Sequence, residues 1–119
     1  MKKLLLLALT TFALLAEVQT RNNISITCYR VAEEGRDKIT VSVQTAGYAD
    51  AFLLTLGTKP FIGSTTQVNF QQKLVKRNLT PGLTWTSVDF YVKTREKIDF
   101  LFVNELRGAG SADFNLDWR

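Results

Sequence analysis

The sequence contains no histidine and only one cysteine, Cys28. Without histidine the chain lacks the usual general base near neutral pH and the commonest zinc ligand. A Ser-His or Cys-His nucleophile pair is therefore excluded, and one cysteine can form neither an internal disulfide nor a metal cluster. Because Cys28 alternates with Ile24 and Ile26, it is expected to be a small buried hydrophobe in a strand.

The chain also has little excess charge of one sign. It contains 15 basic and 11 acidic residues, a net charge of +4, which falls to +2 if Lys2 and Lys3 are left out. Nucleic-acid binding generally needs a clustered basic stripe. The short basic group of Lys73, Lys76 and Arg77 is better explained as a solvated face. The chain is therefore not expected to bind nucleic acid.

The N-terminus has the pattern of a signal peptide. Lys2 and Lys3 supply positive charge, and residues 4–16 carry none. This apolar run is shorter than the ~20 residues that span a bilayer; the alternative is a buried N-terminal helix. We expect residues 1–16 to be removed, with cleavage after Ala16 or as late as Thr20. Residues 21–119 would then form one secreted or periplasmic domain without a membrane span.

Proline is rare, and outside the N-terminal run no window has convincing helical periodicity. The clearest local pattern is a hairpin around the polar turn 32–37, in which Ile39, Val41 and Val43 alternate with polar residues. Seven or eight short strands separated by turns predict an all-β fold, an antiparallel β-sandwich of jelly-roll type. The expected strands are residues 24–31, 38–45, 51–56, 66–75, 84–92, 98–103 and 114–118, with a brief one at 61–64.

The tail joins a glycine loop to a strand with two different faces. Phe114, Leu116 and Trp118 alternate with Asn115 and Asp117, so the apolar side chains can close a core. The other face presents an amide and a carboxylate, two groups that can hold a hydroxyl-rich ligand or a cation.

Two further aromatic residues are candidates for ligand contact. Trp85 follows the Pro81-Gly82 turn and is out of phase with Val88 and Phe90, so it is expected to face away from the core, the alternative being a core tryptophan. Tyr48 is expected in an exposed loop. Aromatic faces stack on pyranose rings, while a few placed polar groups fix the orientation of the sugar.

Three segments together resemble the C-terminal half of a family 6 carbohydrate-binding module: residues 80–88, residues 98–103 and the closing residues 114–118. The resemblance covers roughly residues 24–118. It implies a jelly-roll sandwich that binds a polysaccharide in a loop cleft, has no catalysis of its own and associates with a carbohydrate-active enzyme. By position, Trp85 resembles a stacking aromatic and Asn115 the asparagine that bonds sugar hydroxyls. Asp117 resembles a ligand of a structural calcium ion, for which an oxygen ligand is suitable.

The chain departs from the family pattern at its N-terminal side. Leu83 stands where the family often has a further tryptophan, and the place of the partner aromatic falls near Thr20. Glu17 is the nearest counterpart of the family's calcium-binding glutamate. Tyr48 is therefore the remaining candidate for a second stacking aromatic.

Two other functions are open at this stage. The sandwich could be an adhesion or interaction protein that associates through a sheet edge without binding sugar. It could also be a hydrolase built on two carboxylates drawn from Glu105, Asp113 and Asp117. Because loop and surface positions explain these acids as well, a non-catalytic binding module is the favoured interpretation.

Overall fold

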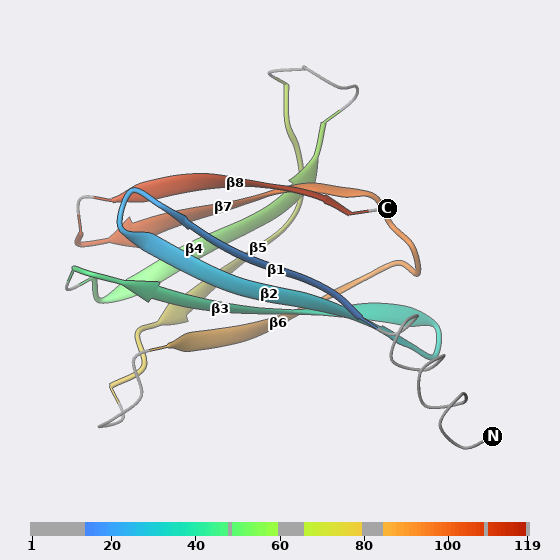
Figure 1. Cartoon of the computed structure of the whole chain (residues 1–119), viewed down its shortest axis with the longest axis horizontal. Helices are drawn as coiled ribbons and strands as arrows, with labels where there is room; N and C mark the ends of the chain where they lie inside the picture. The colour runs from blue at the N-terminus through green and yellow to red at the C-terminus, as the bar shows by residue number, and fades with distance from the viewer. Residues whose placement is uncertain (1–13, 48, 60–65, 80–84, 109, 119) are drawn as a thin grey trace.

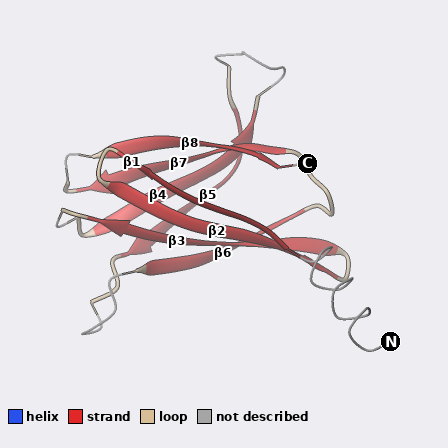
Figure 2. Cartoon of the chain, viewed as in Figure 1, coloured by secondary structure: helices blue, strands red, loops and turns tan. Residues whose placement is uncertain are grey.

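The computed structural model describes residues 14–47, 49–59, 66–79, 85–108 and 110–118, without the side chains of residues 14–17, 69, 70, 117 and 118. Every regular element in this part is a β-strand (Figure 2). The strands are β1 (Leu14–Arg21), β2 (Ile24–Glu33), β3 (Arg36–Thr45), β4 (Ala51–Thr58), β5 (Val68–Lys76), β6 (Thr86–Val92), β7 (Ile98–Leu106) and β8 (Ser111–Trp118).

Two four-stranded antiparallel sheets form a sandwich (Figure 1). Their strand orders are β1-β2-β3-β6 and β5-β4-β7-β8. The predicted all-β antiparallel sandwich is confirmed. Alternation explains it, because in β2, β3, β4, β6, β7 and β8 alternate side chains point into the space between the sheets and are buried there.

The strand order differs from the predicted jelly-roll type, because β1, β2 and β3 are consecutive neighbours in one sheet, whereas a jelly roll is built from two Greek keys. The chain changes sheet between β3 and β4, between β5 and β6, and between β6 and β7. Without β1, the orders β2-β3-β6 and β5-β4-β7-β8 match A-B-E and C′-C-F-G of immunoglobulin-type sandwiches. Local sequence patterns carry no information about which distant strands pair, so this order comes from the structure.

The predicted strands are present, mostly with longer bounds. The expected turn 32–37 shrinks to Glu34-Gly35, where Gly35 has a φ of +79° that only glycine adopts freely. The brief strand expected at 61–64 lies outside the described residues. Sequence reasoning missed β1, because residues 14–16 were assigned to the leader and residues 17–20 to its possible cleavage region.

β1 overlaps the region where cleavage was expected. It pairs along its whole length with β2, from Leu14 opposite Val31 to Arg21 opposite Ile24. Cleavage after Ala16 would remove the first three residues of this strand, and cleavage after Thr20 would leave only Arg21.

The core consists of the inward-facing residues of both sheets. Its largest fully buried side chains include Phe52, Phe90 and Phe114. Cys28 is fully buried among them, as predicted. Burial of each large apolar side chain contributes about 1.5–3 kcal/mol to folding, so this cluster is the main source of stability.

Side chains close the seam where the edge strand β1 of one sheet meets the edge strand β8 of the other. Three β1-side residues donate hydrogen bonds to alternate main-chain carbonyls of β8: Gln19 Nε2 to Asn115 (2.8 Å), Arg21 Nη1 to Asp113 (3.0 Å) and Asn22 Nδ2 to Ser111 (3.1 Å). These bonds occupy carbonyls that would otherwise be free to pair with another chain.

The opposite seam, between β5 and β6, is closed by the same device. Lys73 Nζ donates to the Asp89 carbonyl at 2.6 Å, and Gln71 Nε2 donates to the Tyr91 carbonyl. Lys73 also lies over the Phe90 ring, 5.5 Å from its centroid. Both lateral seams of the sandwich thus use long polar side chains in place of strand pairing.

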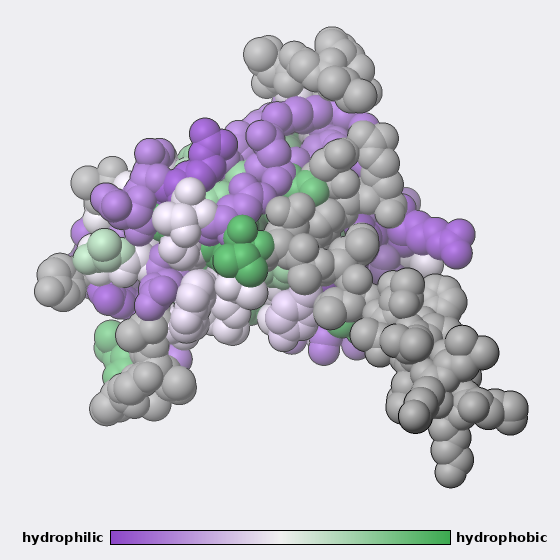
Figure 3. Space-filling model, viewed as in Figure 1, coloured by the Kyte–Doolittle hydropathy of each residue, from purple (hydrophilic) through white to green (hydrophobic). Residues whose placement is uncertain are grey.

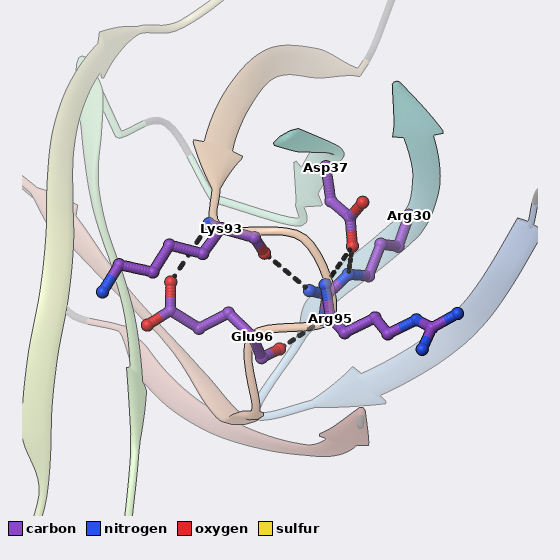
Figure 4. A network of polar contacts seen from close by, with 5 residues as sticks. All are labelled: Arg30, Asp37, Lys93, Arg95 and Glu96. Atoms are coloured by element: carbon purple, nitrogen blue, oxygen red, sulfur yellow. Dashed lines mark hydrogen bonds and ion pairs between the residues drawn. The ribbon is translucent and has the colours of Figure 1, made fainter. Parts of the chain in front are cut away.

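A buried ion pair closes one end of the sandwich, here called the clamp end, where β2 joins β3 and β6 joins β7 (Figure 4). Arg30 is only 4% exposed and donates through Nε to Asp37 Oδ2 at 2.8 Å. Its Nη1 and Nη2 donate to the carbonyls of Glu96 (2.7 Å) and Lys93 (3.4 Å). The Arg95 main-chain N–H also donates to Asp37. Arg30 therefore fastens the β6–β7 connection to the β2–β3 hairpin.

Asp99 makes a second polar contact at the clamp end. Burial by itself would raise the pKa of Asp99, but hydrogen bonds from the Lys59 N–H (2.7 Å) and Thr58 Oγ1 (2.5 Å), together with the nearby charge of Lys97, outweigh it and lower that pKa below 3.8. The ionised carboxylate thus holds the end of β4 against the start of β7.

Candidate ligand-binding site

The other end of the sandwich, here called the loop end, contains an open pocket of about 670 Å³. Three connections meet there, the β1–β2 turn, the β3–β4 loop and the β7–β8 loop, at the left of Figure 1. Its described lining is Asn22, Asn23, Ala46, Gly47, Glu105, Gly108, Gly110 and Ser111. The volume lies in the range of small-molecule sites.

Glu105 is the ionisable side chain in this lining. It lies two positions after the buried Val103 on β7, so it points into the space between the sheets where that space opens to solvent. Its main-chain N–H donates to the Gly110 carbonyl at 2.9 Å, which closes the β7–β8 loop around it.

Three glycines make room for the Glu105 carboxylate. A β-carbon at Gly47 or Gly108 would lie 3.4 or 2.9 Å from Glu105 Oε2, and one at Gly110 would overlap Oε1. None of the three has a positive φ of the kind that requires glycine. A larger residue at these positions would fill the space around the carboxylate, although the backbone conformation would accept it.

The Glu105 carboxylate has no hydrogen bond or ion pair to any other residue in the described part of the chain. The neighbouring cations are engaged elsewhere: Arg107 Nε lies 3.6 Å from Asp50 Oδ2, and Arg21 donates to the carbonyl of Asp113. The pocket therefore presents a partly buried acceptor group to whatever enters it.

A smaller hollow of about 340 Å³ adjoins this pocket and shares Asn23 and Ala46 with it. Its remaining lining includes Thr20, Ser25 and Gln44, from β1, β2 and β3. Thr20 Oγ1 and Ser25 Oγ are hydrogen-bonded at 2.8 Å. The two hollows form one polar surface. This surface and Trp85 are together called the loop-end surface.

Trp85 precedes β6 and is 36% exposed, which confirms that it faces away from the core. Ser25 pairs with Gln44, and the last pair between β3 and β6 is Val43 with Thr86. Trp85 directly precedes Thr86 and Gln44 directly follows Val43, so both residues lie at the loop end of this sheet. Thr20, Ser25 and Gln44 thus form one row across the sheet, and Trp85 lies just before the start of β6 at the same end.

Asn115 lies elsewhere. It is exposed on β8, the edge strand next to β1, whereas Trp85 lies at the β6 edge next to β5. Its side-chain Oδ1 is 3.5 Å from Lys59 Nζ. The structure therefore does not bring Asn115 and Trp85 into one cleft.

The remaining predicted site residues fall where the structure gives no side chains. Tyr48 lies outside the described residues, directly after the pocket-lining Gly47. The main chain of Asp117 belongs to β8, but its side chain is not described. Within the described residues no three His, Cys, Asp or Glu side chains gather to hold a metal ion. The calcium site therefore stays a prediction.

The acids proposed for a carboxylate pair point in different directions. Glu105 faces the inner side of its sheet, whereas Asp113 alternates with the buried Ala112 and Phe114 and so faces outward. Asp113 Oδ2 accepts a hydrogen bond from Gln67 Nε2 at 3.1 Å. Glu105 and Asp113 do not share a cleft in which they could act on one bond.

Sequence reasoning missed most of the loop-end surface. Asn22 and Asn23 have φ values of 52° and 64°, and an Asn-Asn pair is a typical signal for such a tight turn. That signal was available, but it indicates a hairpin only if residues 14–21 are a strand. The row of Thr20, Ser25 and Gln44 depends on pairing between strands and has no local signal.

No family model, curated protein or solved structure matches this chain. The likeness to family 6 carbohydrate-binding modules therefore rests on the quoted segments alone and stays a prediction. Among the described residues there is no helix with the length and apolar character needed to cross a membrane.

Proposed function

We propose that this chain is a secreted, non-catalytic module that binds a polysaccharide on the loop-end surface, in association with a carbohydrate-active enzyme. The observation that carries the proposal is the exposed Trp85 directly before β6, at the end of the sheet where Gln44, Ser25 and Thr20 line a hollow that adjoins the larger pocket.

This arrangement supplies both elements that sugar recognition needs. The Trp85 ring offers an apolar face on which a pyranose can stack, and the amide and hydroxyl groups beside it can bond the sugar hydroxyls. The described surface in Figure 3 is mostly hydrophilic or intermediate, with hydrophobic colour confined to small areas. Such a surface suits a hydroxylated ligand better than an apolar one.

The proposal changes the partners of Trp85 from those suggested by the family resemblance. Gln44 and Ser25 take the place of Asn115, which lies at the other lateral edge. Tyr48 follows Gly47 in the pocket-lining loop and stays the candidate for a second stacking aromatic. The joined hollows have room for more than one sugar unit.

Affinity electrophoresis in soluble β-glucan, xylan and agarose tests the proposal. Retardation in at least one polysaccharide is expected. Trp85→Ala should weaken it about tenfold, a loss of about 1.4 kcal/mol, because the variant removes the apolar face on which a pyranose can stack. Gln44→Ala is expected to weaken binding by a smaller factor.

Tyr91→Ala is the matched control. Tyr91 is 37% exposed on β6, the strand that Trp85 precedes, but it lies about 20 Å away at ~3.3 Å per residue. An equal loss of retardation in Trp85→Ala and Tyr91→Ala would contradict the proposed binding surface, and so would the absence of retardation in every polysaccharide.

A further inference from the structure

Glu105 is the one feature of the loop-end surface that stacking of a neutral sugar on Trp85 does not explain. A carboxylate that is partly buried and lacks a partner is costly, because it loses water without gaining a hydrogen bond. Here three glycines keep the space beside it open. The cost is offset when a ligand brings a donor to that position.

We propose that the larger pocket binds the ammonium group of an amino sugar, with Glu105 as its acceptor. The inference rests on the proposed glycan binding and names the class of glycan: a chain that carries unsubstituted, glucosamine-type units. An ammonium group has three donors and a full positive charge, so it forms an ion pair as well as hydrogen bonds with a carboxylate, whereas a hydroxyl brings one neutral donor.

The other lining residues complete the site for a sugar. Asn23 and Ser111 bring polar side chains to the pocket, and they can bond the hydroxyls that flank the amino group. Asn23 also lines the smaller hollow, so a sugar in the pocket can continue as a chain towards Ser25 and Gln44.

The overall charge of the protein makes this preference easy to distinguish from non-specific attraction. The chain carries a net charge of +4, so its long-range field attracts acidic glycans and repels cationic ones. Preference for a cationic sugar must therefore come from a local acidic group, and Glu105 is the acidic side chain of this pocket.

The test compares tri-glucosamine with tri-N-acetylglucosamine by titration calorimetry of the full chain at pH 6, where the sugar amino groups are protonated. The two ligands share the same number of rings and differ in charge. Wild type is expected to bind tri-glucosamine at least about tenfold more tightly. Glu105→Gln is expected to remove this preference while binding of the acetylated trisaccharide changes less than about twofold.

Two variants control for effects of charge and of folding. Asp113→Asn removes an acid from the outer face of the neighbouring strand and is expected to keep the preference. Gly110→Ala keeps the carboxylate but places a methyl group in the space that the carboxylate occupies. This variant is expected to weaken the binding of tri-glucosamine. Spermidine, a polyamine without sugar rings, is expected to bind more weakly than tri-glucosamine.

The outcomes separate this inference from the proposed function. Equal binding of the two trisaccharides, or an unchanged preference in Glu105→Gln, would overturn the amino-sugar assignment even if Trp85→Ala still weakened polysaccharide binding. Stronger binding of spermidine would overturn it too. Absence of binding to any saccharide would overturn both proposals.

Discussion

The two ends of the sandwich differ in whether a buried or partly buried charged side chain has hydrogen-bond partners within the protein. At the clamp end, Arg30 is almost fully buried and donates to Asp37 and to two loop carbonyls. At the loop end, Glu105 is partly buried, surrounded by glycines and without a partner in the described residues. The Arg30 guanidinium is hydrogen-bonded within the protein and holds the clamp end together. The Glu105 carboxylate keeps its acceptor atoms available to a ligand at the loop end.

The largest expected effect of a substitution is at the clamp end. Arg30→Ala leaves Asp37 buried without its cationic partner, which should lower the free energy of unfolding by about 3–5 kcal/mol. Urea denaturation measures this. Arg36→Ala is the control, because its ion pair with Glu33 is exposed and should contribute about 0–1 kcal/mol. Similar losses in both variants would show that the buried network has no special role.

Asp99 gives a smaller, pH-dependent effect at the same end. Asp99→Asn should cost about 1–2 kcal/mol near neutral pH, since hydrogen bonds to a charged group contribute somewhat more than neutral ones. The pKa of Asp99 is lowered in the folded protein, so its stabilisation is complete above 3.8 and is lost as the pH falls through the folded value. Urea denaturation from pH 6 to pH 2.5 should show the two proteins converging only at the acidic end.

Gly110→Ala at the loop end should change stability by less than about 1 kcal/mol, the usual size of a glycine-to-alanine effect. The added β-carbon meets the end of the flexible Glu105 side chain, which can move, and lies 3.6 Å from Ile24 Cδ1. Thermal unfolding measures the effect. A loss as large as that of Arg30→Ala would mean that the loop end is packed as tightly as the clamp end.

The smallest expected effect on stability is that of Glu105→Gln. Within the described residues the Glu105 carboxylate has no hydrogen-bond partner to lose, so the free energy of unfolding should stay the same or rise by up to about 0.5 kcal/mol. Chemical denaturation checks this. Marked destabilisation would indicate that Glu105 has a structural partner, and the contrast between the two ends would disappear.

Much of the secondary structure was predictable because alternation is a local signal. Ile39, Val41 and Val43 identify their strand and its buried face without reference to the rest of the chain. The outward direction of Trp85 followed from the same phase argument. β1 was missed because residues 14–16 fell in the uncharged run assigned to the leader and residues 17–21 have no clear alternation of their own. Only its pairing with β2, a contact between two segments, reveals the strand.

The site was less predictable because its residues belong together only in three dimensions. The amino-acid sequence by itself determined the strands, the buried faces and an exposed tryptophan, since each depends on side chains a few positions apart. Tertiary structure decided that Trp85 joins Gln44 and Ser25, that Asn115 lies at the other edge, and that Glu105 faces a pocket. The physical reason is that strand order and register are set by contacts between distant segments, which no local pattern records.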